Sequence, residues 1–164
     1  MGEKNSSLYK IIREKILELQ RKAKFECLQC KKSCCTRNIE RIPLLKGDYE
    51  LLLNNEADLG GVKLYETGQC HLLRLYKKNH CYYYDKKEGL CTIHEIKPLY
   101  CFAFPFDFKL VNMTFQGKPV NLLRSIYFPN SYCTWVEEEY KKQNLDQSLA
   151  EEVRDLIRQY VLEQ

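Results

Sequence analysis

The chain begins and ends with segments whose apolar residues recur at helical spacing. Over residues 7–24 the apolar positions are three or four residues apart, so they share one face of a helix. They are Leu8, Ile11, Ile12, Ile16, Leu19 and Ala23. Residues 148–163 repeat the pattern, and Ser148 with Glu151 has the spacing of a capping box. The C-terminal stripe consists of Leu149, Val153, Leu156, Ile157, Tyr160 and Val161. The sequence therefore predicts amphipathic helices at both ends of the chain.

Between these helices the pattern changes to short apolar or alternating runs separated by turn residues. Strands are predicted at residues 38–44, 62–66 and 70–78. A short helix capped by Asp48 is predicted over residues 47–57, followed by a turn at Gly60 and Gly61.

Two β-hairpins are predicted in the second half of the chain. The first covers residues 81–94 and turns at 86–89, and the second covers 106–128 with Gly117 in its turn. Together these elements predict an α+β fold. We expect a small mixed single domain over residues 1–164, with β-hairpins, a cysteine-rich metal-binding middle and amphipathic helices at both termini.

Composition and charge narrow the function classes. A chain of 164 residues with 45% hydrophobic and 29% charged residues is long and apolar enough to bury an ordinary core. The 26 basic and 22 acidic side chains are mixed along the chain, so no tail for nucleic acid stands out. No run approaches the roughly 18 apolar residues of a membrane span, and the charged N-terminus lacks the apolar core of a secretion signal. We expect a cytoplasmic protein with no membrane partner.

The nine cysteines carry the most specific signal in the sequence. In a reducing compartment, clustered cysteines are metal ligands or redox groups more often than disulfides, and an odd number cannot pair completely. Four of them fall within nine positions: Cys27, Cys30, Cys34 and Cys35. Cys27-x2-Cys30 has the spacing of half a metal site. Adjacent side chains such as Cys34 and Cys35 tend to diverge, which favours two nearby metals or a polynuclear cluster.

The remaining sulfurs for such a centre lie downstream. Cys81, Cys91 and Cys101 follow at ten-residue spacings, and Cys133 comes later. With the first four they make eight, enough for two four-thiolate sites. Cys70 is expected to be a small buried bystander. His71 and His80 each neighbour a cysteine, and strand alternation predicts that they face away from it.

The motifs "CLQCKKSCC", "CYYY", "CTIHEIKPLYC" and "FPF" resemble the YkgJ-like cysteine-cluster family (CxxCxxCC), a zinc- or iron-chelating domain. The resemblance covers residues 25–106 and leaves the molecular role unassigned. It implies metal binding through seven cysteines: Cys27, Cys30, Cys34, Cys35, Cys81, Cys91 and Cys101. Cys133 is the candidate for an eighth ligand. This chain departs from the family pattern at Phe102, where Arg is usual, and at His94, where Tyr is usual. His94 could supply a nitrogen, although a packing or surface role is the simpler interpretation.

The sequence thus predicts a metal-binding protein with zinc, or less readily iron, in a multi-cysteine centre. The alternative is an iron–sulfur redox protein or accessory enzyme that passes electrons or sulfur to a partner. No nucleophile with its base and no pair of catalytic carboxylates stands out, so whether the protein is an enzyme stays open. Binding of nucleic acid through Lys31, Lys32 and Arg37 is a weaker third interpretation.

Overall fold

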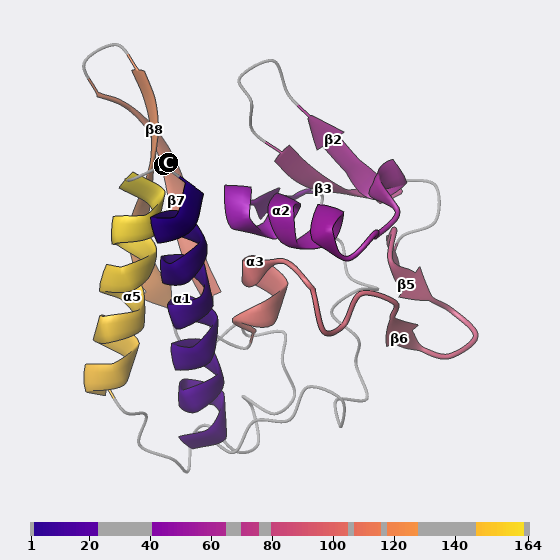
Figure 1. Cartoon of the computed structure of the whole chain (residues 1–164), viewed down its shortest axis with the longest axis horizontal. Helices are drawn as coiled ribbons and strands as arrows, with labels where there is room; N and C mark the ends of the chain where they lie inside the picture. Colours follow the sequence, from indigo (N-terminus) through magenta and orange to yellow (C-terminus); the bar gives the residue numbers. More distant parts are fainter. Residues whose placement is uncertain are drawn as a thin grey trace. The chain divides into compact units, whose positions relative to one another are not determined.

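The computed structural model describes residues 2–22, 41–64, 70–75, 80–104, 107–115, 118–127 and 147–162 (Figure 1). The chain divides into two compact units, one formed by residues 1–30 with 103–164 and the other by residues 31–102. Each contains helices and antiparallel strands in its described part. The fold class is therefore α+β, as the sequence predicts.

The first unit contains the two terminal helices, α1 (Gly2–Lys22) and α5 (Gln147–Leu162). They lie side by side with opposite chain directions (Figure 1). Their facing stripes bury apolar side chains almost completely, because residues three and four apart share one helix face. The most buried are Ile12, Ile16, Leu19, Val153, Ile157 and Tyr160. The rings of Tyr9 and Tyr160 lie 5.6 Å apart between their centroids and contribute to this core.

The terminal helices differ from the sequence prediction in detail. Helix α1 begins at Gly2 rather than residue 7, and Ile11, expected on the buried face, is 40% exposed. Tyr9 takes part in the core instead, because its side chain is buried against α5. Helix α5 begins at Gln147, so Ser148 lies in its first turn and not at the predicted capping position. Ala23 lies outside the described residues.

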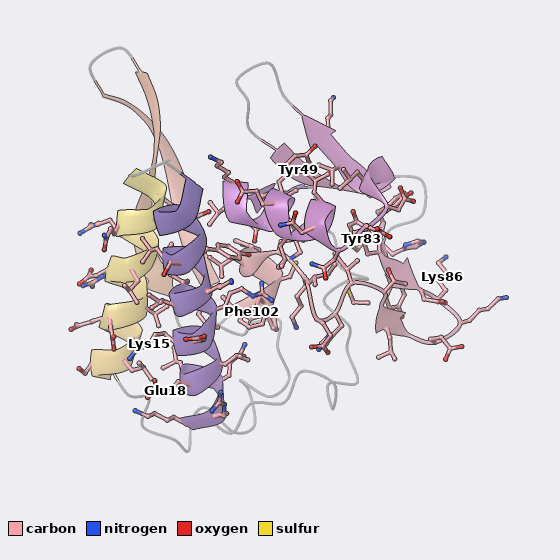
Figure 2. All side chains as sticks on the ribbon, in the orientation of Figure 1. Lys15, Glu18, Tyr49, Tyr83, Lys86 and Phe102 are labelled. Carbon is pink, nitrogen blue, oxygen red and sulfur yellow. The ribbon has the colours of Figure 1, made fainter. Side chains whose placement is uncertain are left out.

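An ion pair on the surface joins these helices. Lys15 Nζ lies 3.0 Å from a carboxylate oxygen of Glu152 and 3.7 Å from one of Glu18 (Figure 2 labels Lys15 and Glu18). The hydrogen bond to Glu152 is the main cause that raises the pKa of Lys15. Between 33% and 48% of each of the three side chains is exposed, so the pair adds little to stability.

A long hairpin completes the described part of the first unit. Strand β7 (Asp107–Phe115) pairs antiparallel with β8 (Lys118–Tyr127), in the segment where the sequence predicts the second hairpin. The register shifts between Lys109 and Leu110, which marks a β-bulge. Strand β8 contacts α5. The predicted turn residue Gly117 lies outside the described residues.

The second unit contains a small antiparallel sheet. Its strands are β1 (Arg41–Leu44), β2 (Val62–Leu64), β3 (Cys70–Leu75) and β4 (His80–Cys81). The order is β1-β3-β2, and β4 also pairs with β3. Strand β3 therefore pairs with segments on both sides of it in the sequence. Residues 38–40 of the first predicted strand lie outside the described part.

The first predicted hairpin divides into two short pairings. Its first residue, Cys81, belongs with His80 to β4 and pairs with β3, whereas β5 (Tyr84–Asp85) pairs with β6 (Leu90–Cys91). The turn between β5 and β6 includes Gly89 at φ 69°, a left-handed conformation that glycine adopts without strain. Tyr82 and Tyr83 form the bend between the two pairings.

Two helical segments lie next to this sheet. In the first of them Asp48 does not have the predicted capping position. Helix α2 (Lys46–Asn54) has Leu45 at its N-cap, so Asp48 is the third helical residue and not the cap. Its side chain is completely buried, and one carboxylate oxygen accepts the backbone N–H of Leu45 at 2.7 Å. Helix α3 (Leu99–Phe102) is a single turn that contains Cys101.

The predicted turn at the double glycine is a short 3₁₀ helix, η3 (Leu59–Gly61). A Cβ atom on Gly61 would lie 2.4 Å from Cγ of Tyr82, and one on Gly60 would lie 2.5 Å from the Tyr82 hydroxyl oxygen. Gly61 is therefore required by the close approach of the base of an aromatic ring, whereas Gly60 meets only the far end of the same side chain.

Candidate metal centre

Three of the predicted ligands belong to the described part of the chain, and each lies on a different element. Cys81 is on β4, Cys91 on β6 and Cys101 on α3. All three carry thiols and none is half of a disulfide. Three thiols are thus available from three separately positioned segments of one unit.

The same three cysteines belong to a single hydrophobic core. Cys81 is 6% exposed and packs with Ile42, Leu52 and Tyr83, and the partly buried Cys91 and Cys101 pack against this cluster. A surrounding of apolar and aromatic side chains limits access of water and oxidants to sulfur. The arrangement suits thiols that serve as ligands in a closed site.

Backbone hydrogen bonds position Cys91 on both of its sides. Cys91 pairs with Tyr84 across β5 and β6, and the next residue, Thr92, donates its backbone N–H to the carbonyl oxygen of Tyr83 at 2.8 Å. The carbonyl of Cys91 accepts the backbone N–H of His94 at 3.2 Å. The bond from Thr92 holds this segment next to Tyr83, and the bond from His94 closes a tight turn directly after Cys91.

Asp48 positions the helix that contains Cys101. One oxygen of its buried carboxylate accepts the backbone N–H of Leu99 at 2.6 Å, while the other accepts that of Leu45. Leu99 is the first residue of α3, where backbone N–H groups have no partner within the helix. The carboxylate thus fixes the start of the turn that presents Cys101, from a position 51 residues earlier in the sequence.

Tyr83 lies in the same core as the three cysteines. It lies close to α2 and the β5–β6 hairpin (Figure 2), and its hydroxyl donates to the carbonyl oxygen of Asp58 at 2.5 Å. Burial raises the pKa of Tyr83 to about 12, and the charges of Asp58, Cys81 and Cys91 add to the effect. The phenol is neutral at physiological pH and adds no negative charge beside these cysteines.

Asp58 anchors both tyrosines from the surface. Its carboxylate accepts the Tyr82 hydroxyl at 2.5 Å and the backbone N–H of Gly60 at 2.8 Å. The hydrogen bond from Tyr82, followed by that from Gly60, lowers the pKa of Asp58. These contacts hold the aromatic residues that cover Cys81 and Cys91 in one arrangement. No sequence pattern singles out Asp58 for this role.

The described cysteines do not by themselves make a complete metal site. Within the described ranges, no three His, Cys, Asp or Glu side chains gather closely enough to hold a metal ion. The other five predicted ligands lie outside these ranges: Cys27, Cys30, Cys34, Cys35 and Cys133. The backbones of Cys70 and His71 belong to β3, and their side chains are not described.

A metal would nevertheless fit the chemistry of the described donors. Thiolate and imidazole are the usual protein ligands of zinc, and thiolates hold iron–sulfur clusters. Besides the three thiols, the unit buries an imidazole nitrogen, Nε2 of His80, that has no hydrogen-bond partner in the described structure.

A protein-family comparison decides the affiliation of the chain. The model of the family CxxCxxCC, described as "Putative zinc- or iron-chelating domain", matches residues 26–134. The chain belongs to this family. The match covers more than half of the chain and includes all eight predicted cysteine ligands, which confirms the resemblance seen in the sequence. No curated protein and no solved structure matches the chain.

Membership in the CxxCxxCC family supports metal binding but does not choose between zinc and iron. In the described part of the chain, no helix combines the length and the apolar character needed to cross a membrane.

Proposed function

We propose that this CxxCxxCC protein holds zinc in a multi-cysteine centre and that the metal stabilises the fold of residues 31–102. The observation that supports this most directly is the convergence of Cys81, Cys91 and Cys101, from three elements, on one hydrophobic core. Elements as short as two or four residues contribute few contacts of their own. A metal bound to all three cysteines would hold these short elements together.

The proposed ligands are the seven cysteines implied by the family resemblance. They are Cys27, Cys30, Cys34, Cys35, Cys81, Cys91 and Cys101. Two four-coordinate sites need eight ligands, so seven cysteines leave one position unfilled. Cys133 is the sulfur candidate for that position. Sites closed by four protein ligands leave no open position for chemistry, so the zinc would be structural. Cytoplasmic location is part of the proposal, because a reducing compartment keeps these thiols available.

The alternative keeps the same cysteines but gives them iron. The family description includes iron, and an iron–sulfur centre would make the protein a redox or accessory protein that passes electrons or sulfur to a partner. The two functions differ in colour, because iron–sulfur centres absorb visible light and zinc thiolates do not.

Removal of the metal tests the structural role. We expect chelation under reducing conditions to unfold much of the unit formed by residues 31–102, since metal-binding energy is then folding energy. Hydrogen exchange read segment by segment should show lost protection in α2, β1 and β3. Helices α1 and α5 form an internal control, because they pack on each other through apolar side chains. An unchanged melting temperature and unchanged exchange after complete removal of the metal would show that the metal does not hold the fold.

A further inference from the structure

His80 is a buried histidine next to one of the proposed cysteine ligands. It lies on β4 directly before Cys81, and both side chains are buried. The imidazole is 8% exposed, and its ring centroid lies 5.9 Å from that of Tyr84. The sequence prediction that it faces away from Cys81 rests on alternation alone, and two residues of strand are too short to enforce it.

One hydrogen bond determines the tautomer of this ring. Nδ1 of His80 lies 2.9 Å from the carbonyl oxygen of Cys81. A carbonyl oxygen can only accept, so Nδ1 must carry the proton, and in the neutral ring Nε2 then presents its lone pair. The bond also fixes the ring relative to the peptide group of Cys81, the neighbouring thiol ligand of the proposed centre.

Nε2 is left without a partner in the described structure. The atom is buried from water and has no hydrogen-bond donor near it among the described residues. A buried polar atom that loses its partner costs about 1–3 kcal/mol. Such groups are rare in folded proteins and indicate a strained or functional position, or an ion that completes the contact.

We infer that Nε2 of His80 is a nitrogen ligand of the metal, so that the centre combines thiolates with one imidazole. This inference rests on the proposed function, since it names a further ligand of the same centre. The hydrogen bond pattern is the one that metal-binding histidines show, in which the second ring nitrogen donates to a backbone carbonyl and orients the ring. Structural zinc sites are found with three thiolates and one imidazole as well as with four thiolates.

His80 then takes the position for which Cys133 is the sulfur candidate. Seven cysteines and one histidine complete two four-coordinate sites. His94 is the competing nitrogen, but its side chain is only partly buried and so keeps contact with water. In the described part of the chain, Nε2 of His80 is a buried nitrogen without a hydrogen-bond partner.

The test is X-ray absorption spectroscopy at the zinc edge on the full chain loaded with zinc alone. We expect imidazole scattering beside sulfur in the wild type, and its loss in His80→Phe. Cys133→Ser and His94→Phe are the matched controls and should retain it. The zinc affinity of His80→Phe should fall by at least about tenfold. Loss of a residue that only hydrogen-bonds to a metal ligand lowers affinity by about 10–100-fold, and loss of a direct ligand should cost at least the lower figure. His80→Cys should recover affinity without imidazole scattering.

Each contrary result separates the two proposals. Zinc bound through sulfur alone in the wild type, or imidazole scattering that persists in His80→Phe, would overturn the role of His80 and leave the cysteine centre standing. A wild-type protein that binds no zinc or iron at all would overturn both. If His80→Phe does not fold, the wild-type spectrum and the His80→Cys variant still decide, because neither depends on the Phe protein.

Discussion

Replacing Asp48 by Asn tests whether a buried carboxylate positions the segment that contains Cys101. Asp48 is fully buried, and its two oxygens accept the backbone N–H groups of Leu45 at 2.7 Å and Leu99 at 2.6 Å. Asparagine has nearly the same shape but only one acceptor oxygen. Its amide NH₂ must therefore face one of the two backbone N–H groups, so that two donors oppose each other.

The expected loss follows from these two contacts. A hydrogen bond to a charged group contributes about 1.5–3 kcal/mol, and a buried donor without an acceptor costs a comparable amount. One such bond disappears in the Asn variant and the other becomes neutral. We expect the free energy of unfolding to fall by about 2–4 kcal/mol, a large share of the roughly 5–15 kcal/mol typical of a folded domain.

Urea unfolding of the metal-loaded chain, followed by circular dichroism, measures this change. Glu50→Gln is the matched control on the same helix. Glu50 lies 3.9 Å from Lys46 in an exposed ion pair, so its loss should change the free energy of unfolding by less than about 0.5 kcal/mol. If Asp48→Asn is as stable as the control variant, the carboxylate does not fix α3, and Cys101 is positioned by other contacts.

Three further predictions address the surroundings of the site and the terminal helices. Gly61→Ala should lower the free energy of unfolding by about 1–3 kcal/mol in a denaturant titration, because its Cβ would meet the ring of Tyr82 at 2.4 Å; a wild-type midpoint would show that the ring moves freely. Since the pKa of Tyr83 is raised to about 12, its contribution to stability should be present below pH 10 and lost as the pH rises through 12. Ultraviolet titration should show a late-ionising phenol that Tyr83→Phe lacks, and the same curve in both proteins would contradict this. Lys15→Met should shift the melting temperature little at any salt concentration, because its pair with Glu152 is exposed; a large, salt-sensitive shift would refute this.

Local sequence patterns predicted the elements that depend on local interactions. The apolar stripes around Ile16 and Ile157 predicted two helices, because helix periodicity reports burial directly. The turn that includes Gly89 and the long hairpin over residues 106–128 could also be predicted, because turn residues stand between two strand-like runs. The strand order β1-β3-β2 could not be predicted, because pairing between distant strands leaves no local pattern in the sequence.

The candidate site shows the same division. Spacing and family resemblance identified Cys81, Cys91 and Cys101 as ligands, and this assignment is still a prediction. The supporting contacts could not be read from the sequence. Asp48 resembled a helix cap, and its bond to Leu99 crosses 51 residues. His80 was predicted only to face away from Cys81, and its burial and the hydrogen bond that orients its ring could not be read from the sequence. Contacts made only by the folded chain decide both positions.

The measurement that tests metal binding most directly is elemental analysis with a visible spectrum, on untagged protein purified without oxygen. We expect about two zinc ions per chain, the number that eight ligands fill at four each, and no visible colour. Brown protein with iron and acid-labile sulfide would replace the structural zinc centre by the iron–sulfur alternative. Protein that contains neither metal, and takes up neither when its thiols are reduced, would contradict the proposed function.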